Sequence, residues 1–212
     1  MQVRAAGGRG FTIVEMMVVV AIIGVVATIT IGALGGLKQR GTYVAATGDL
    51  LVGIRRTRAE AYGRGNTTIF VVDSIGGRWW SIADPNDTFS LATFDPASPA
   101  AAAGVVLLDN GTFPTGVSFG PAAGYGALPR PFAIITATSP CSFCKSGAPN
   151  DGFGAISFRT TGGATFAGAV GAATAAGGSV VVQGTANAGK YTMAIAVVGR
   201  TGASQTYERM SP

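Results

Sequence analysis

The chain has 212 residues, of which 48% are apolar, 12% are charged and 33 are glycine, and it contains no histidine. The absence of histidine excludes Ser-His-Asp triads, most catalytic zinc sites and histidine pH switches. The net charge of +5, from 15 basic and 10 acidic side chains, is too mild to require a nucleic-acid partner. The length suits one domain with an additional element.

The most apolar part of the chain is a run near the N-terminus. From Phe11 to Leu37 the only ionisable side chain is Glu15. As a helix, residues 16–37 would be about 33 Å long, which matches a bilayer core. We therefore predict a transmembrane half of a helix at residues 11–37. A secretory signal peptide and a plain single-pass anchor are alternatives, but the run is long for a signal peptide and an unpaired Glu15 would be costly in lipid.

Residues 10–28, GFTIVEMMVVVAIIGVVAT, resemble the N-terminal signature of type IV pilins and type II secretion pseudopilins. In that family, prepilin peptidase removes a short basic leader after a Gly, the new N-terminal residue is methylated, and a Glu stands at the fifth mature position. The resemblance implies a leader at residues 1–10, cleavage between Gly10 and Phe11, and N-methylation of Phe11. It also implies that Glu15 pairs with the N-terminus of a neighbouring subunit.

The same resemblance implies partners and a location. The partners would be prepilin peptidase, other major and minor pilins or pseudopilins, and the inner membrane. The chain would cross the membrane once with a periplasmic head, and would enter a pilus or pseudopilus after assembly.

The helical pattern continues beyond Lys38. Apolar residues recur at helical spacing, among them Leu50, Ile54 and Tyr62. The pattern predicts one helix from Phe11 to about Tyr62, with an amphipathic half at residues 38–64 that packs on a globular domain and ends at the following glycines. The arginines of this half are interpreted as a solvated face, with a nucleic-acid or lipid patch as the alternative.

Residues 65–212 change to a period of two, with turn residues at short intervals. The pattern predicts an α+β fold of the pilin type, in which the long helix precedes an all-β, sandwich-like head. Adjacent Trp79 and Trp80 are expected on opposite faces of a strand, one in the core and the other exposed or at a contact. Strands are expected at 67–73, 78–83, 88–94, 105–108, 116–119, 132–138, 153–158, 164–166, 179–183, 191–198 and 205–208.

Two further segments are similar to the pseudopilin-H and FimT-like group of minor pilins. These are the Arg-rich end of the helix with the strand after it, residues 51–72, and the string ISFRTTG at 156–162. This similarity implies a minor subunit that primes assembly or belongs to a tip complex. Some FimT-like members are thought to bind DNA through a C-terminal Gly-Arg-x-Arg motif. Here Arg200 is followed by Thr201 and Gly202, so the second Arg is missing, and Lys190 and Arg209 are the cations that could add charge.

Cys141 and Cys144 form the string CSFC in a loop rich in Pro and Gly. A redox centre would place this pair at a helix start, and zinc would need two further ligands. The remaining interpretation is a small structural disulfide in an oxidising compartment, worth about 2 kcal/mol. The string GTANAGKY at 184–191 nearly matches a phosphate-binding loop, but it lies between two strands and lacks the final Ser or Thr. Without a clear catalytic constellation, we expect a protein that is not an enzyme and binds neither metal nor cofactor.

Overall fold

A computed structural model describes residues 12–101, 104–120, 128–129, 132, 135, 137, 139–147, 150–168, 176–184 and 191–210, without the side chains of 30–37, 191, 209 and 210. The chain divides into two units, Met1–Lys38 and Gln39–Pro212. The predicted leader, Gly10, Phe11 and Lys190 lie outside the described residues.

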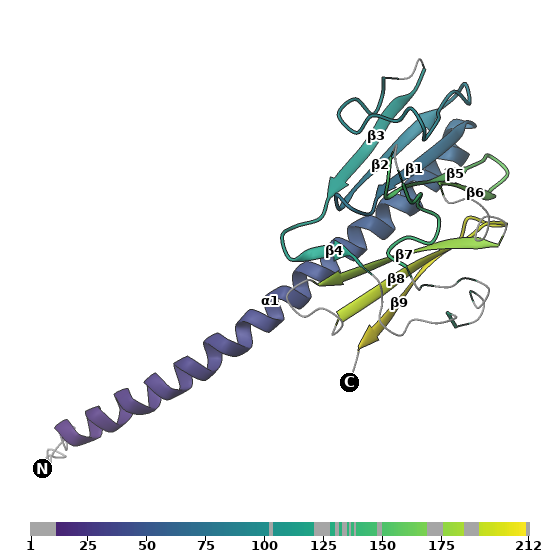
Figure 1. Ribbon diagram of the computed structural model, residues 1–212. Helices are drawn as coiled ribbons and strands as arrows, with labels where there is room; N and C mark the ends of the chain where they lie inside the picture. Colours follow the sequence, from purple (N-terminus) through teal and green to yellow (C-terminus); the bar gives the residue numbers. More distant parts are fainter. Residues whose placement is uncertain are drawn as a thin grey trace, which may run out of the picture. The chain divides into compact units, whose positions relative to one another are not determined.

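The single helix of the described residues, α1, spans Ile13–Arg64 and confirms the helix predicted from Phe11 to about Tyr62 (Figure 1). It ends where Gly65 adopts a φ of 67°, and the Gly65 N–H donates to the Ala61 carbonyl oxygen at 3.1 Å. A positive φ of this size favours glycine, which explains why the helix stops here.

The structure does not confirm the transmembrane half of the helix that was predicted at residues 11–37. Over the part of the chain that the structure describes, no helix combines the length and the apolar character that a membrane crossing needs.

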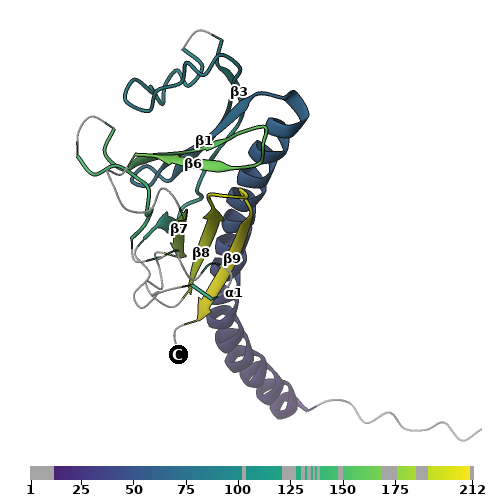
Figure 2. The same cartoon turned by 90° about the vertical axis from the view of Figure 1, so that its right-hand side faces the viewer.

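The second unit contains two antiparallel sheets, which confirms the α+β class and the predicted β-rich head. The five-stranded sheet has the order β3-β2-β1-β5-β6, and the four-stranded sheet has the order β4-β7-β8-β9. Both lie on the same side of the helix segment 39–64, one beyond the other along it (Figure 2). The strands are β1 Thr67–Asp73, β2 Arg78–Asp84, β3 Val106–Thr112, β4 Val117–Phe119, β5 Phe153–Phe158, β6 Ala164–Ala167, β7 Gly177–Gly184, β8 Tyr191–Val198 and β9 Ser204–Met210.

One hydrophobic core joins the two sheets to the helix. Tyr43, Leu50 and Ile54 of α1 are fully buried in it. The inner face of each sheet supplies the rest, including Phe70 and Ile156 from one and Val182 and Ile195 from the other. The helix segment therefore covers the inner faces of both sheets.

Part of the outer face of the five-stranded sheet is also covered, by side chains of the segment between β2 and β3 such as Phe94 and Val105. Trp79 is 6% exposed and Trp80 is 4% exposed, on opposite faces of β2. The expectation that one of them is exposed was wrong, because Phe94 and Val105 cover Trp80 from outside. Trp79 packs so closely on β3 that an ideal Cβ at Gly111 would lie 2.5 Å from its indole ring.

The strand predicted at residues 88–94 is not formed. The Asp84 carboxylate accepts hydrogen bonds from the backbone N–H groups of Thr88 at 3.0 Å and Phe89 at 2.8 Å. A side chain that satisfies these groups offers the backbone an alternative to a sheet ladder. The apolar residues of this segment pack on the sheet face instead of extending it. The strand predicted at 132–138 lies mostly outside the described residues.

Candidate functional site

The first turn of α1 carries Glu15, one of the residues that the pilin-like signature singled out. Thr12 directly precedes the helix, and its Oγ1 accepts a hydrogen bond from the Glu15 backbone N–H at 3.3 Å. The Thr12 carbonyl oxygen accepts the first helical bond, from the Met16 N–H at 3.2 Å. Thr12 is therefore the N-cap and Glu15 is the third helical residue, which is the spacing of a capping box.

The Glu15 carboxylate has a favourable local field and no partner in the described part of its own chain. It lies in the first turn, where the helix dipole stabilises negative charge. No basic side chain among the described residues forms an ion pair with it. The carboxylate is exposed, so it is open to a cation from outside the chain.

The side chains around Glu15 are apolar and uncovered. Ile13 is 82% exposed and Met17 is 70% exposed. Exposed apolar side chains continue to Ile29, including valines and isoleucines on every face of the helix. A continuous apolar surface of this kind is typical of an interaction surface, because soluble monomers rarely leave one open. The described part of the first unit is thus a helix with an open apolar surface.

The arginines of the C-terminal half of α1 are mostly paired. Arg56 contacts Asp109 at 3.0 Å, Arg64 contacts Glu60 at 2.7 Å, and Arg40 contacts Glu208 at 3.6 Å. Exposed pairs of this kind contribute little stability. They favour the interpretation of these arginines as a solvated face.

Cys141 and Cys144 form a disulfide, as predicted. It lies in residues 140–145, which we call the disulfide clasp because this segment is bonded to both sheets. The Ser142 N–H donates to the Ser179 carbonyl oxygen of β7 at 2.9 Å, and the Lys145 N–H donates to the Phe153 carbonyl oxygen of β5 at 2.8 Å. Between the two cysteines, Phe143 is fully buried against Phe166 of β6. The disulfide is therefore structural, and it holds an aromatic side chain where the sheets adjoin.

The three cations considered for DNA binding are not brought together. Arg200 is exposed in the turn between β8 and β9. Arg209 pairs with Thr192 at the opposite end of the same hairpin, since Val197 pairs with Ser204 next to the turn. Lys190 lies outside the described residues.

Two arginines that the sequence did not connect with this turn lie against it. The Arg55 guanidinium donates to the Ser204 carbonyl oxygen at 3.3 Å. Arg58 Nε would lie 3.1 Å from an ideal Cβ at Gly202. This Nε atom has no hydrogen-bond partner among the described residues. Only the pairing of β8 with β9 brings Gly202 and Ser204 back to the helix, so no local sequence signal could have identified this group.

Comparison with known proteins identifies the N-terminal segment alone. Residues 7–31 match the prokaryotic N-terminal methylation motif, which contains Gly10, Phe11 and Glu15. This motif is a signal of the type IV pilin kind, and it supports the pilin and pseudopilin class for the chain. Neither the curated proteins nor the solved structures gave a significant match.

Proposed function

We propose that the chain is a structural subunit of a type IV pilus or of a type II secretion pseudopilus, with no catalytic activity of its own. Prepilin peptidase would cut between Gly10 and Phe11, and Phe11 would then be methylated. The observation that carries this proposal is the methylation motif at residues 7–31. The motif includes the capped start of α1. The C-terminal half of the same helix contributes to the core of an α+β head.

The geometry of the first helical turn supports a docking role for Glu15. Cleavage after Gly10 would leave Phe11 as the N-terminal residue, next to the N-cap Thr12. A positive amine at a helix N-terminus opposes the helix dipole, whereas Glu15 in the first turn favours it. An amine from a neighbouring subunit would compensate the carboxylate, and the exposed apolar side chains would be covered by the helices of neighbours.

The more specific role that we propose is that of a minor subunit in the FimT-like and pseudopilin-H group, which primes assembly. The string at 156–162 supports it, since it forms the end of β5 and the turn to β6, with Gly162 at a φ of 89°. We place the chain at the inner membrane before assembly, on the support of the motif. The disulfide supports a periplasmic location for the head, because disulfides persist in oxidising compartments.

Cleavage is tested by co-expressing the full chain with a prepilin peptidase and measuring intact mass. The wild-type chain should lose residues 1–10 and gain one methyl group. Gly10→Val should keep the leader, because a branched side chain replaces the smallest residue at the cleaved bond. Gly8→Val is the matched control and should be processed. Equal processing of the two variants, or a mature chain that begins elsewhere, would contradict the proposal.

Docking is tested with Glu15→Gln, which keeps the shape of the side chain and removes its charge. We expect the variant to be processed but at least tenfold depleted from sheared pili or pseudopili. Asp49→Asn is the matched control, since Asp49 is an exposed carboxylate on the C-terminal half of α1. Normal incorporation of the Glu15 variant would refute the role in docking.

A second candidate function is DNA binding, and one observation favours it. Arg55 and Arg58 lie against the β8–β9 turn in which Arg200 is exposed, so three guanidinium groups belong to one region of the head. Such a group could contact phosphates, with the affinity falling as salt rises. In a mobility-shift assay at low salt, Arg200→Gln should weaken binding and Arg64→Gln, which removes an arginine paired with Glu60, should not. An unchanged shift with Arg200→Gln would exclude this candidate.

A further inference from the structure

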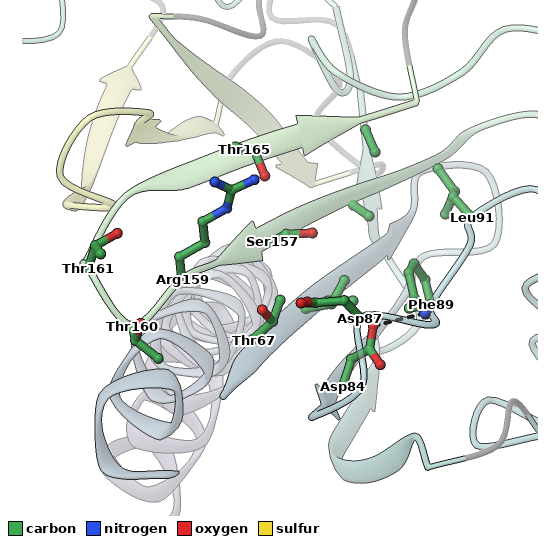
Figure 3. Close-up of a pocket in the computed structure, with 13 residues that line it drawn as sticks. Thr67, Asp84, Asp87, Phe89, Leu91, Ser157, Arg159, Thr160, Thr161 and Thr165 are labelled. Carbon is green, nitrogen blue, oxygen red and sulfur yellow. Dashed lines mark hydrogen bonds between the residues drawn. The ribbon is translucent and has the colours of Figure 1, made fainter. Parts of the chain in front are cut away.

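A groove of about 710 Å³ lies on the outer face of the five-stranded sheet (Figure 3). One wall is the segment that follows β2, and the other is the hairpin that joins β5 to β6. The volume lies within the range of small-molecule sites, about 300–1,000 Å³. The lining combines hydroxyl groups, three charged side chains (Asp84, Asp87 and Arg159) and a limited apolar surface.

The floor of the groove is set by the strand register. Ser157 of β5 pairs with Ile69 of β1 on one side and with Thr165 of β6 on the other. Successive side chains of a strand point to opposite faces, so every second residue of these three strands faces the groove. Across β5 and β6 the hydroxyl groups of Ser157 and Thr165 lie side by side, and so do the small side chains of Ala155 and Ala167. Its members are Thr67, Ile69, Ala155, Ser157, Thr165 and Ala167.

The apolar wall is fixed by contacts behind it. Asp84 is 2% exposed, and its carboxylate holds the backbone of Thr88 and Phe89. The Phe89 ring contacts the Phe94 ring at a centroid distance of 5.7 Å, and Phe94 packs in turn on Trp80. Phe89 is thus held against an aromatic cluster on one side and lines the groove on the other.

The opposite wall is a tight turn. The Arg159 N–H donates to the Gly163 carbonyl oxygen at 3.1 Å, and the Gly162 N–H donates to the Arg159 carbonyl oxygen at 2.9 Å. These bonds fix the backbone at Arg159, and Figure 3 shows its side chain extending over the sheet toward Thr165. The groove is therefore bounded by two ordered walls, which reduces the entropy lost when a ligand binds.

Of the three charged side chains that line the groove, Asp84 is buried and bonded to the Thr88 and Phe89 N–H groups, whereas the two exposed ones are unused within the described residues. Arg159 and Asp87 are both exposed, they come from opposite walls, and neither forms an ion pair or a side-chain hydrogen bond with another described residue. A guanidinium only donates, a carboxylate only accepts, and hydroxyl groups do both. A polyanion would be repelled by Asp87 and a polycation by Arg159, so the balance favours a neutral ligand rich in hydroxyl groups.

We propose that this groove binds a short neutral oligosaccharide. Arg159 donates to sugar oxygens, Asp87 accepts from sugar hydroxyls, and the floor hydroxyls complete the network. The ring of Phe89 and the side chain of Leu91 contact the apolar C–H face of a sugar. This inference goes beyond a role in a pilus or pseudopilus and does not depend on it.

The test is isothermal titration of the full chain in a zwitterionic detergent without a sugar headgroup, because maltoside detergents would compete. The probes are cellotetraose, maltotetraose and chitotetraose. We expect a Kd below about 1 mM for at least one of them, and about tenfold weaker binding for Arg159→Gln and for Asp87→Asn, since each removes a hydrogen bond to a charged group. Asn tolerates the φ of 52° at position 87, and Arg64→Gln is the control outside the groove.

Three results would overturn the proposal. The first is no heat of binding for any of the three probes at about 5 mM. The second is binding that neither groove variant weakens; Thr165→Val, which changes one floor hydroxyl, provides the same comparison if a charge variant does not fold. The third is self-association of the wild-type chain, measured by sedimentation, that Arg159→Gln abolishes in the absence of sugar binding. That third result would assign the groove to a second copy of the chain.

Discussion

The disulfide clasp allows a quantitative prediction about the stability of the head. The perturbation is the paired substitution Cys141→Ser with Cys144→Ser, or reduction of the disulfide. The two cysteines are separated by three positions, so the closed loop has about four residues and its loss should cost about 2 kcal/mol. The hydrogen bonds from Ser142 to β7 and from Lys145 to β5 involve backbone groups that both perturbations leave in place.

Truncation of the aromatic side chain inside the clasp should cost more. Phe143 is fully buried, and Phe→Ala in a core typically costs 3–5 kcal/mol. We therefore expect the free energy of unfolding to fall by about 2 kcal/mol without the disulfide and by about 3–5 kcal/mol in Phe143→Ala. The assay is urea denaturation of the full chain in detergent. A larger loss for the disulfide than for Phe143→Ala, or two titratable thiols in native unreduced protein, would refute the reasoning.

Three further predictions concern single side chains of the head. Gly111→Ala should lower the free energy of unfolding by about 1–3 kcal/mol, because the new Cβ would meet the Trp79 ring at 2.5 Å. Gly48→Ala has open space around it and should stabilise the helix by up to about 1 kcal/mol. The midpoints of urea denaturation compare the two variants. Asp84→Ala should cost about 1–3 kcal/mol and should increase amide exchange at Thr88 and Phe89, and unchanged exchange would contradict its role. Burial raises the pKa of Tyr207, so the folded state keeps the phenol proton at a pH where the unfolded state loses it. The free energy of unfolding should therefore fall as the pH rises above about 10. The fall should be smaller in Tyr207→Phe.

Much of the fold could be predicted because local pattern determined it. The helix, the class of the head and most of its strands follow from periodicity, and the bounds of β8 match the prediction residue for residue. The segment at 88–94 has the composition of a strand, but a buried carboxylate from β2 satisfies its backbone. Trp80 is buried because Phe94 and Val105 fold back over the sheet. Both depend on contacts between segments, which a period of two does not encode.

The residues of the candidate site also fall into those that local sequence predicts and those that it does not. The N-terminal signature is contiguous, so Gly10, Phe11 and Glu15 could be named from sequence, and the disulfide followed from eliminating other uses of two nearby cysteines. The capping role of Thr12 was missed, although the spacing of Thr12 and Glu15 carries that signal. The groove could not be predicted from the sequence, because Asp87 and Arg159 come to line the same groove only through the pairing of β1 with β2 and with β5.

That pairing also sets the order in which the head can fold. β1 pairs with β2 along one edge and with β5 along the other, as Thr68 opposite Phe158 shows. A chain delivered from its N-terminus would present β1, β2, β3 and β4 before the strand that closes the free edge of β1. An unpaired edge is a template for pairing with other chains, and contacts distant in sequence form slowly. A chain interrupted before residue 153 would therefore leave β1 open to aggregation and proteolysis, so a stable head requires the chain to be present as far as β5.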